Sequence, residues 1–146
     1  MFMGEYHHNI DEKGRIVIPG KFREIAKHTI IVTRGIENCL YLYTEEEWNN
    51  LVNKLNTLPF TKKDARTFMR SFFAGATSSE FDRSGRINIT SPLVSYAGLT
   101  KECVVIGVND RIEIWDAKAY EKYMNDNSSK LEEIAEHLFE ASNETL

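Results

Sequence analysis

The sequence predicts an α+β fold built from two copies of one small, strand-rich unit, with amphipathic helices added. Three observations support this fold class. Residues 10–18 (IDEKGRIVI) align with residues 81–89 (FDRSGRINI), and residues 35–43 (GIENCLYLY) align with residues 107–115 (GVNDRIEIW). The matched blocks occur in the same order, so the chain contains an internal repeat. Apolar residues at helical spacing follow the strand-rich part of each copy.

Each copy begins with an extended segment that leads into an Asp-x-x-Gly-Arg turn. Gly14 and Gly85 supply a residue that adopts positive φ without penalty, as a tight reversal between strands requires. A short strand is expected after each turn. In the second copy, Ile87 and Ile89 alternate with the polar Asn88, which is the period of a half-buried strand.

A short helix is predicted next in each copy. Pro19 marks its start in the first copy, and Ser91-Pro92 mark it in the second, where the serine is expected to cap the helix. These helices of about two turns should end near Ala26 and Ala97. Two further strands close each unit, with turns at residues 37–38 and 109–110.

Longer amphipathic helices complete the chain. Thr44 and Glu47 form a capping box, and Asp116 can cap the corresponding helix of the second copy. Their apolar stripes are expected to pack on the strand core or on a neighbouring subunit. The predicted division is a first unit with its helix at 1–60, a connecting helix at 61–75, a second unit at 76–124 and a C-terminal helix at 125–146.

Composition agrees with a globular protein, because 42% of the residues are hydrophobic and 27% are charged. Cys39 and Cys103 lie far apart, so we expect two buried thiols rather than a disulfide or a cysteine zinc site. No apolar run reaches the length of a membrane span and no export leader is evident, which predicts a cytosolic protein. The net charge of −4 argues weakly against nucleic acid, since binding needs only a local positive patch.

The repeated Asp-x-x-x-Arg turn is the main candidate site. On one interpretation, Asp11 and Asp82 only cap backbone N–H groups while Arg15 and Arg86 are solvated. However, a turn between strands requires only the glycine, whereas both copies keep Asp and Arg as well. An arginine fork can donate two hydrogen bonds to guanine, and a β-ribbon can enter the major groove of DNA. The aspartate would orient the arginine through a charge-assisted hydrogen bond.

Further basic residues gather around the first turn. Lys13, Lys21 and Arg23 could contact DNA phosphates and set the register of binding, and Arg83 could act similarly in the second copy. The alternative is an ordinary solvated helix face. The second copy lacks counterparts of Lys21 and Arg23, so we expect the first copy to dominate DNA contact.

Catalysis, metal binding and cofactor binding have little support in the sequence. His7 and His8 are adjacent, so on a strand they point to opposite faces, which is poor geometry for one metal ion. No phosphate loop, nucleophile elbow or His-Glu-x-x-His metalloprotease motif occurs. We therefore expect no enzyme, no cofactor, no metal and no small-molecule substrate.

The chain resembles the MraZ family over nearly its whole length, and each unit resembles the swapped-hairpin domain of AbrB-like transcription factors. The resemblance is carried by MFMGEY at residues 1–6, DEKGR at 11–15, FFAGA at 72–76, DRSGR at 82–86 and the segments around Ile18-Pro19 and Ile112 to Trp115. It implies a pseudo-symmetric β-barrel made from the two units. It also implies a transcriptional regulator of the division and cell-wall gene cluster, including its own promoter.

The same resemblance implies a ring-shaped homo-oligomer that binds short direct repeats of double-stranded DNA in the cytoplasm, at the nucleoid. Asp11, Gly14, Asp82 and Gly85 would then support the DNA-facing turns that carry Arg15 and Arg86. The alternative is a structural or regulatory protein-binding oligomer that does not read DNA sequence. Salt dependence separates the two, because binding through phosphates weakens steeply with added salt.

Overall fold

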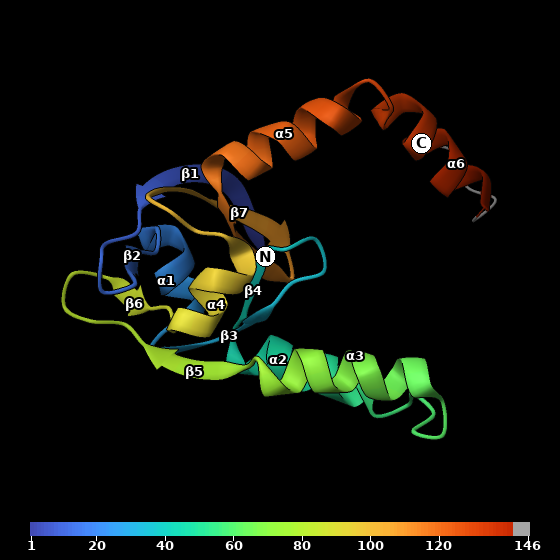
Figure 1. Cartoon of the computed structure of the whole chain (residues 1–146), viewed down its shortest axis with the longest axis horizontal. Helices are drawn as coiled ribbons and strands as arrows, with labels where there is room; N and C mark the ends of the chain where they lie inside the picture. The colour runs from blue at the N-terminus through green and yellow to red at the C-terminus, as the bar shows by residue number, and fades with distance from the viewer. Residues whose placement is uncertain (142–146) are drawn as a thin grey trace.

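The computed structural model describes residues 1–141 and has a strand-rich body with two helical arms (Figure 1). The first copy of the repeat forms β1 (Phe2–Asn9), β2 (Arg15–Val17), α1 (Gly20–Ala26), β3 (Thr29–Arg34), β4 (Leu40–Tyr43) and α2 (Glu45–Leu55). The second copy forms β5 (Thr77–Glu80), β6 (Arg86–Asn88), α4 (Ser91–Ala97), β7 (Glu102–Asn109), β8 (Arg111–Asp116) and α5 (Ala117–Ser128). Helix α3 (Lys63–Ala74) precedes the second copy, and α6 (Leu131–Ala141) follows α5.

The two copies are interleaved. Six strands form one sheet in the order β1-β7-β8-β4-β3-β5, and β2 pairs with β6 in a separate two-stranded ribbon. All of these pairings are antiparallel. The strand order reads the same from either end when the copies are exchanged. The first strand of each copy therefore pairs with the third strand of the other copy.

A closed barrel does not form among the described residues, which differs from the architecture that the resemblance implied. β1 and β5 are the two edges of the six-stranded sheet, and no ladder joins one to the other. The β2–β6 ribbon occupies the gap, with β2 beside β1 and β6 beside β5. A ribbon of three residues per strand is too short to extend either edge by a full ladder. The fold is therefore an α+β arrangement with an open sheet and a separate ribbon.

The core under the ribbon is apolar and shared by both copies. Ile16 and Ile87 face each other at the centre of the ribbon, and both are almost fully buried. They join a cluster that also contains Phe22 of α1 and Leu93 of α4. Burying such side chains contributes about 1.5–3 kcal/mol each relative to leaving them exposed. The ribbon is thus fixed to the body by its inward face.

The sequence-predicted helix caps are confirmed at two positions and wrong at a third. The side chain of Thr44 accepts a hydrogen bond from Glu47 N, and Asp116 accepts one from Ala119 N. Ser91, in contrast, is the first residue of α4, and Thr90 precedes it without a side-chain cap. Pro92 still lies in the first turn of α4, where its missing N–H costs nothing.

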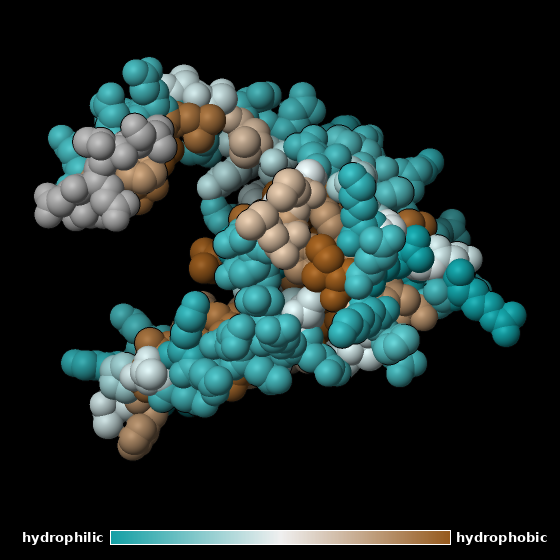
Figure 2. Space-filling model, turned by 180° about the vertical axis from the view of Figure 1, so that it is seen from behind, coloured by the Kyte–Doolittle hydropathy of each residue, from teal (hydrophilic) through white to brown (hydrophobic). Residues whose placement is uncertain are grey.

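Two arms project from the body on the same side (Figure 1). One is the α2–α3 hairpin, in which α3 lies in the connecting segment expected at 61–75 and α2 lies within the first unit expected at 1–60. The other is α5 and α6, whose join at residues 129–130 falls within the C-terminal helix expected at 125–146; residues 142–146 lie outside the described part of the chain. A second apolar cluster lies on the sheet between the arms. Figure 2 shows the hollow that separates the two arms. Within residues 1–141, no helix is long and apolar enough to cross a membrane.

Candidate nucleic-acid interface

The first Asp-x-x-x-Arg turn is closed by one carboxylate. Asp11 Oδ1 accepts hydrogen bonds from the backbone N–H groups of Lys13 and Arg15, each at 2.9 Å. Asp11 Oδ2 accepts from Arg15 Nε at 2.7 Å. Gly14 has a φ of +83°, a backbone conformation that residues with a Cβ rarely adopt. The aspartate therefore folds the turn with one oxygen and orients the arginine with the other.

The second turn repeats this geometry atom for atom. Asp82 Oδ1 accepts from the N–H groups of Ser84 and Arg86 at 2.9 Å, and Asp82 Oδ2 accepts from Arg86 Nε at 2.8 Å. Gly85 has a φ of +75°. The capping and arginine-orienting roles, which were alternatives in the sequence, thus occur together in both turns.

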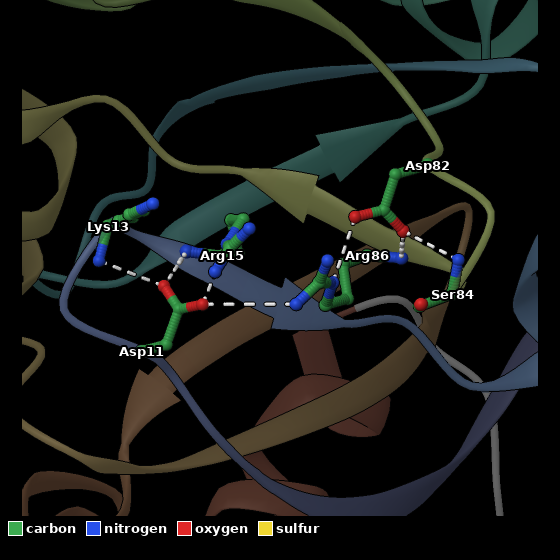
Figure 3. Close-up of polar contacts among 6 residues, drawn as sticks. All are labelled: Asp11, Lys13, Arg15, Asp82, Ser84 and Arg86. Atoms are coloured by element: carbon green, nitrogen blue, oxygen red, sulfur yellow. Dashed lines mark hydrogen bonds and ion pairs between the residues drawn. The ribbon is translucent and has the colours of Figure 1, made fainter.

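The two arginines share one face of the β2–β6 ribbon (Figure 3). Arg15 pairs with Asn88 and Arg86 with Val17, on either side of the buried Ile16–Ile87 pair. Because side chains alternate along a strand, Arg15 and Arg86 both point away from the core. Arg86 Nη1 also lies 4.0 Å from Asp11 Oδ2, which links the two turns. The sequence did not reveal this cross-contact, because it depends on strand pairing between the copies.

Both carboxylates are held in the charged form. The pKa of Asp11 is lowered, chiefly because its carboxylate accepts the backbone hydrogen bond from Arg15. The pKa of Asp82 is lowered in the same way by the backbone N–H of Arg86. Since the ordinary aspartate pKa is already acidic, both ion pairs persist throughout the neutral range. The side chains of Arg15 and Arg86 are about one-third exposed, so they are supported on one side and open to solvent on the other.

The other basic candidates divide into two groups. Lys13, Lys21 and Arg83 are exposed and can reach a ligand from the turns or from α1. Arg23 is half-buried instead, and its Nε donates to Ile18 O at 2.9 Å. Its guanidinium lies against Gly85, so it belongs spatially to the second turn and not to the first. This removes part of the reason for expecting the first copy to dominate.

The short helices α1 and α4 each lie near the turn of the other copy. α1 of the first copy places Arg23 beside the second turn. α4 of the second copy contributes Ser91 and Val94 to a shallow groove that Lys13 and Gly14 also line. The helix of the other copy therefore lies beside each turn, in contact at the second turn and across a groove at the first. This relationship follows from the interleaved strands and has no signal in the spacing of the motifs.

Asn88 is an outward-facing ribbon residue that was not a candidate from the sequence. It is exposed and lies opposite Arg15 on the same face. Its amide has the donor and acceptor pair that suits an adenine edge. The alternation of Ile87, Asn88 and Ile89 was the available signal, because it already predicts that Asn88 faces away from the core.

In a comparison with known protein families, the model of one family matches residues 1–71 and again residues 72–141. That family is described as "MraZ protein, putative antitoxin-like". The two matches together span nearly the whole chain. The chain belongs to the MraZ family. It contains two tandem MraZ units, which correspond to the two halves of the internal repeat, and the matches meet within α3. MraZ proteins are non-enzymatic regulators.

The remaining titratable candidates of this MraZ chain have structural partners. His7 lies between Glu5 and Glu102, at 3.2 and 3.3 Å, and the hydrogen bond with Glu5 is the main cause of its raised pKa. Cys39 and Cys103 are buried free thiols, and burial raises their pKa to about 12 and about 11. Such thiols are poor nucleophiles and poor metal ligands. Among residues 1–141, no three His, Cys, Asp or Glu side chains are grouped to hold a metal ion.

Proposed function

We propose that this MraZ protein is a sequence-specific DNA-binding transcriptional regulator that reads bases with Arg15 and Arg86. The observation that carries the proposal is the pair of identical Asp–Arg turns on one outward face of a two-stranded ribbon. A two-stranded antiparallel ribbon has the width to enter the major groove. Each aspartate uses the Nε donor, and the Nη groups carry the donors that can reach guanine O6 and N7.

Phosphate contacts would come from exposed cations beside the turns. Lys13 and Arg83 lie within the turns, and Lys21 lies in the first turn of α1. Their charges are local, so the net charge of −4 does not oppose binding at this face. Contacts of this kind position the protein on DNA without reading its sequence.

The target that we propose comes from the MraZ family. It is the promoter region of the division and cell-wall gene cluster, including the protein's own promoter, where short direct repeats would each receive one subunit. Binding there would place the protein in the cytoplasm, at the nucleoid. Several subunits that engage successive repeats together would gain avidity beyond that of a single weak contact.

A ring homo-oligomer is the assembly that we propose, and exposed apolar residues on the two arms support it. Leu131, Ile134 and Leu138 of α6 are exposed, as is Phe60 at the tip of the α2–α3 arm. The charges around them are opposite: the α3 arm carries Lys62, Lys63, Arg66 and Arg70, whereas α6 carries Glu132, Glu133, Glu136 and Glu140. Contact between α6 of one copy and the α3 arm of the next would be heterologous, and heterologous contacts build a ring when the rotation between successive subunits closes.

The DNA proposal is tested by fluorescence anisotropy with the protein's own upstream DNA and a scrambled duplex, at two salt concentrations. Arg15→Ala should lose the preference for the upstream DNA, because one bidentate contact contributes about 1–3 kcal/mol of discrimination. Lys130→Ala is the matched control, since Lys130 lies between α5 and α6, far from the ribbon (Figure 1). Equal binding of both duplexes, or an unchanged preference in folded Arg15→Ala, would contradict base reading by this residue.

The assembly proposal is tested by sedimentation with Leu138→Asp and Phe60→Asp. Each variant retains one intact face, so each alone should be monomeric, while an equimolar mixture should form pairs and nothing larger. Ile36→Asp is the control, because Ile36 is equally apolar and is 70% exposed but lies outside the arms. Wild-type mass for either arm variant would contradict the proposed contact.

A protein-binding oligomer that does not read DNA sequence is the second candidate. The exposed apolar side chains on the arms favour it, because such patches on monomers mark interaction sites. Salt dependence separates the candidates. DNA binding through phosphates should weaken steeply with added salt, whereas apolar association should not.

A further inference from the structure

Arg23 makes two contacts that join the first copy of the repeat to the turn of the second. Its Nε donates to Ile18 O at 2.9 Å. A Cβ placed on Gly85 would lie 2.5 Å from Arg23 Cζ, 2.6 Å from Nη1 and 2.7 Å from Nε. The guanidinium therefore lies flat over the Cα of Gly85, at the distance that only a glycine permits.

Ile18 completes a closed set of contacts with these two residues. Its backbone N–H donates to Gly85 O at 3.0 Å, while its carbonyl accepts from Arg23. Gly85 is thus held from one side by the chain that leaves β2 and covered by Arg23. The next residue is Arg86, whose backbone N–H and Nε are both held by Asp82. A shift of Gly85 would consequently move Arg86.

The first turn has no such support. In the alignment of the copies, the position of Arg23 is occupied by Val94, a partly buried side chain that packs against the core. There the backbone contact alone remains, with Ile89 N donating to Gly14 O at 2.7 Å. The carbonyl of Ile89 fills the space beside Gly14 where the guanidinium lies beside Gly85. The two turns therefore share their internal geometry but differ in what holds them.

We infer that Arg23 is a positioning residue for the second turn, which fixes Gly85 and through it the direction of Arg86, and is not primarily a phosphate contact. This inference rests on the proposed function only for the role of Arg86 in DNA reading. The positioning itself is a property of the free protein. Lysine cannot replace Arg23, because an ammonium group lacks both the planar surface over Gly85 and the fixed Nε donor.

The test combines a measurement without DNA and one with DNA, on Arg23→Ala and Arg23→Lys. Without DNA, backbone amide hydrogen exchange of Ser84 and Arg86 should become roughly tenfold faster in both variants, because a hydrogen bond from a charged donor is lost. Exchange of Lys13 and Arg15 should not change. Lys21→Ala, which removes a neighbouring exposed cation, should leave both turns protected.

With DNA, the dependence of affinity on salt separates positioning from phosphate contact. Loss of one phosphate contact lowers the slope of log affinity against log salt by about 1. We expect Arg23→Ala to keep the wild-type slope, and we expect both Arg23→Ala and Arg23→Lys to lose discrimination at the base pairs that respond to Arg86→Ala. Unchanged exchange of Ser84 and Arg86 in both variants would overturn the inference, whatever happens with DNA. Faster exchange in a protein that binds no specific DNA would uphold the positioning and reject the proposed function instead.

Discussion

Ile16 and Ile87 are directly opposed in the β2–β6 ribbon, and their burial dictates which way Arg15 and Arg86 point. If one strand slipped by one residue in this pairing, its side chains would change faces and its arginine would turn toward the core. The register of the ribbon is therefore a requirement of the site as well as of the fold.

Truncation of this pair should be costly. Ile16→Ala is expected to lower the free energy of unfolding by about 2–5 kcal/mol, because it leaves a cavity beneath the ribbon. Ile87→Ala should behave alike, and the double variant should depart from additivity since the side chains are in contact. Urea unfolding measures all three. A loss below about 1 kcal/mol for either single change would mean that the ribbon is not fixed through this pair.

Replacement of three glycines with positive φ by alanine should destabilise the protein to different extents, depending on the atoms around each glycine. Gly14→Ala should be the most damaging, because the new Cβ would meet the backbone oxygen of Ile89 at 2.5 Å. Gly85→Ala should be milder, since the obstacle is the flexible side chain of Arg23. Gly98→Ala is the control: its φ is +61° and no atom lies within 4 Å of the new Cβ, so only the conformational cost of about 1–2 kcal/mol applies. Thermal unfolding of the three variants would establish the order, and a Gly14→Ala no worse than Gly98→Ala would contradict it.

Replacing the turn carboxylate should separate its two roles. Asp82→Asn retains an oxygen for the N–H groups of Ser84 and Arg86 but presents an amide to Arg86 Nε. The turn should therefore stay protected in hydrogen exchange, while the DNA preference is lost with the direction of the arginine. Asp82→Ala should lose both. If Asp82→Asn bound DNA like the wild type, orientation by the carboxylate would be unnecessary.

Arg15→Ala and Arg86→Ala should weaken DNA binding by amounts of the same order. The first copy was expected to dominate because of Lys21 and Arg23, yet Arg23 lies at the second turn. The two aspartate-bound arginines have matching geometry, at 2.7 and 2.8 Å. Parallel anisotropy titrations of the two variants provide the comparison. A difference of more than about tenfold, or 1.4 kcal/mol, would restore the asymmetry.

The contacts of His7 with Glu5 and Glu102 should stabilise the protein at acidic pH and not at basic pH. Its pKa is raised above the ordinary value of 6.5, mainly by the hydrogen bond with Glu5 and then by that with Glu102. A raised pKa means that the contribution is complete below 6.5 and fades as the pH rises through the folded value. His7→Ala should therefore destabilise the protein by a few tenths of a kcal/mol at about pH 5.5, given the exposure of the pair. At about pH 8.5 wild type and variant should unfold alike in urea, and a loss that grows with pH would reverse the sign argued here.

Features encoded by near neighbours were predictable from the sequence. Thr44 and Asp116 cap helices through residues three positions away, and the glycine turns need only their own backbone. The contact of Arg23 with Gly85 was not predictable, because repeat alignment treats each copy as self-contained. The sequence also did not predict that the sheet stays open. Closure of a barrel depends on which strands pair with each other, and the alignment of the two copies does not determine those pairings.

The interleaved strand order also constrains how the protein can form during synthesis. Phe2 of β1 pairs with Asn109 of β7, so the first strand to leave the ribosome waits for one of the last. Until then, its hydrogen-bonding groups have no partner within the nascent chain, and unpaired strands of this kind invite association with other chains. The first copy cannot be completed ahead of the second, so the sheet reaches its final strand order only after translation has passed β8.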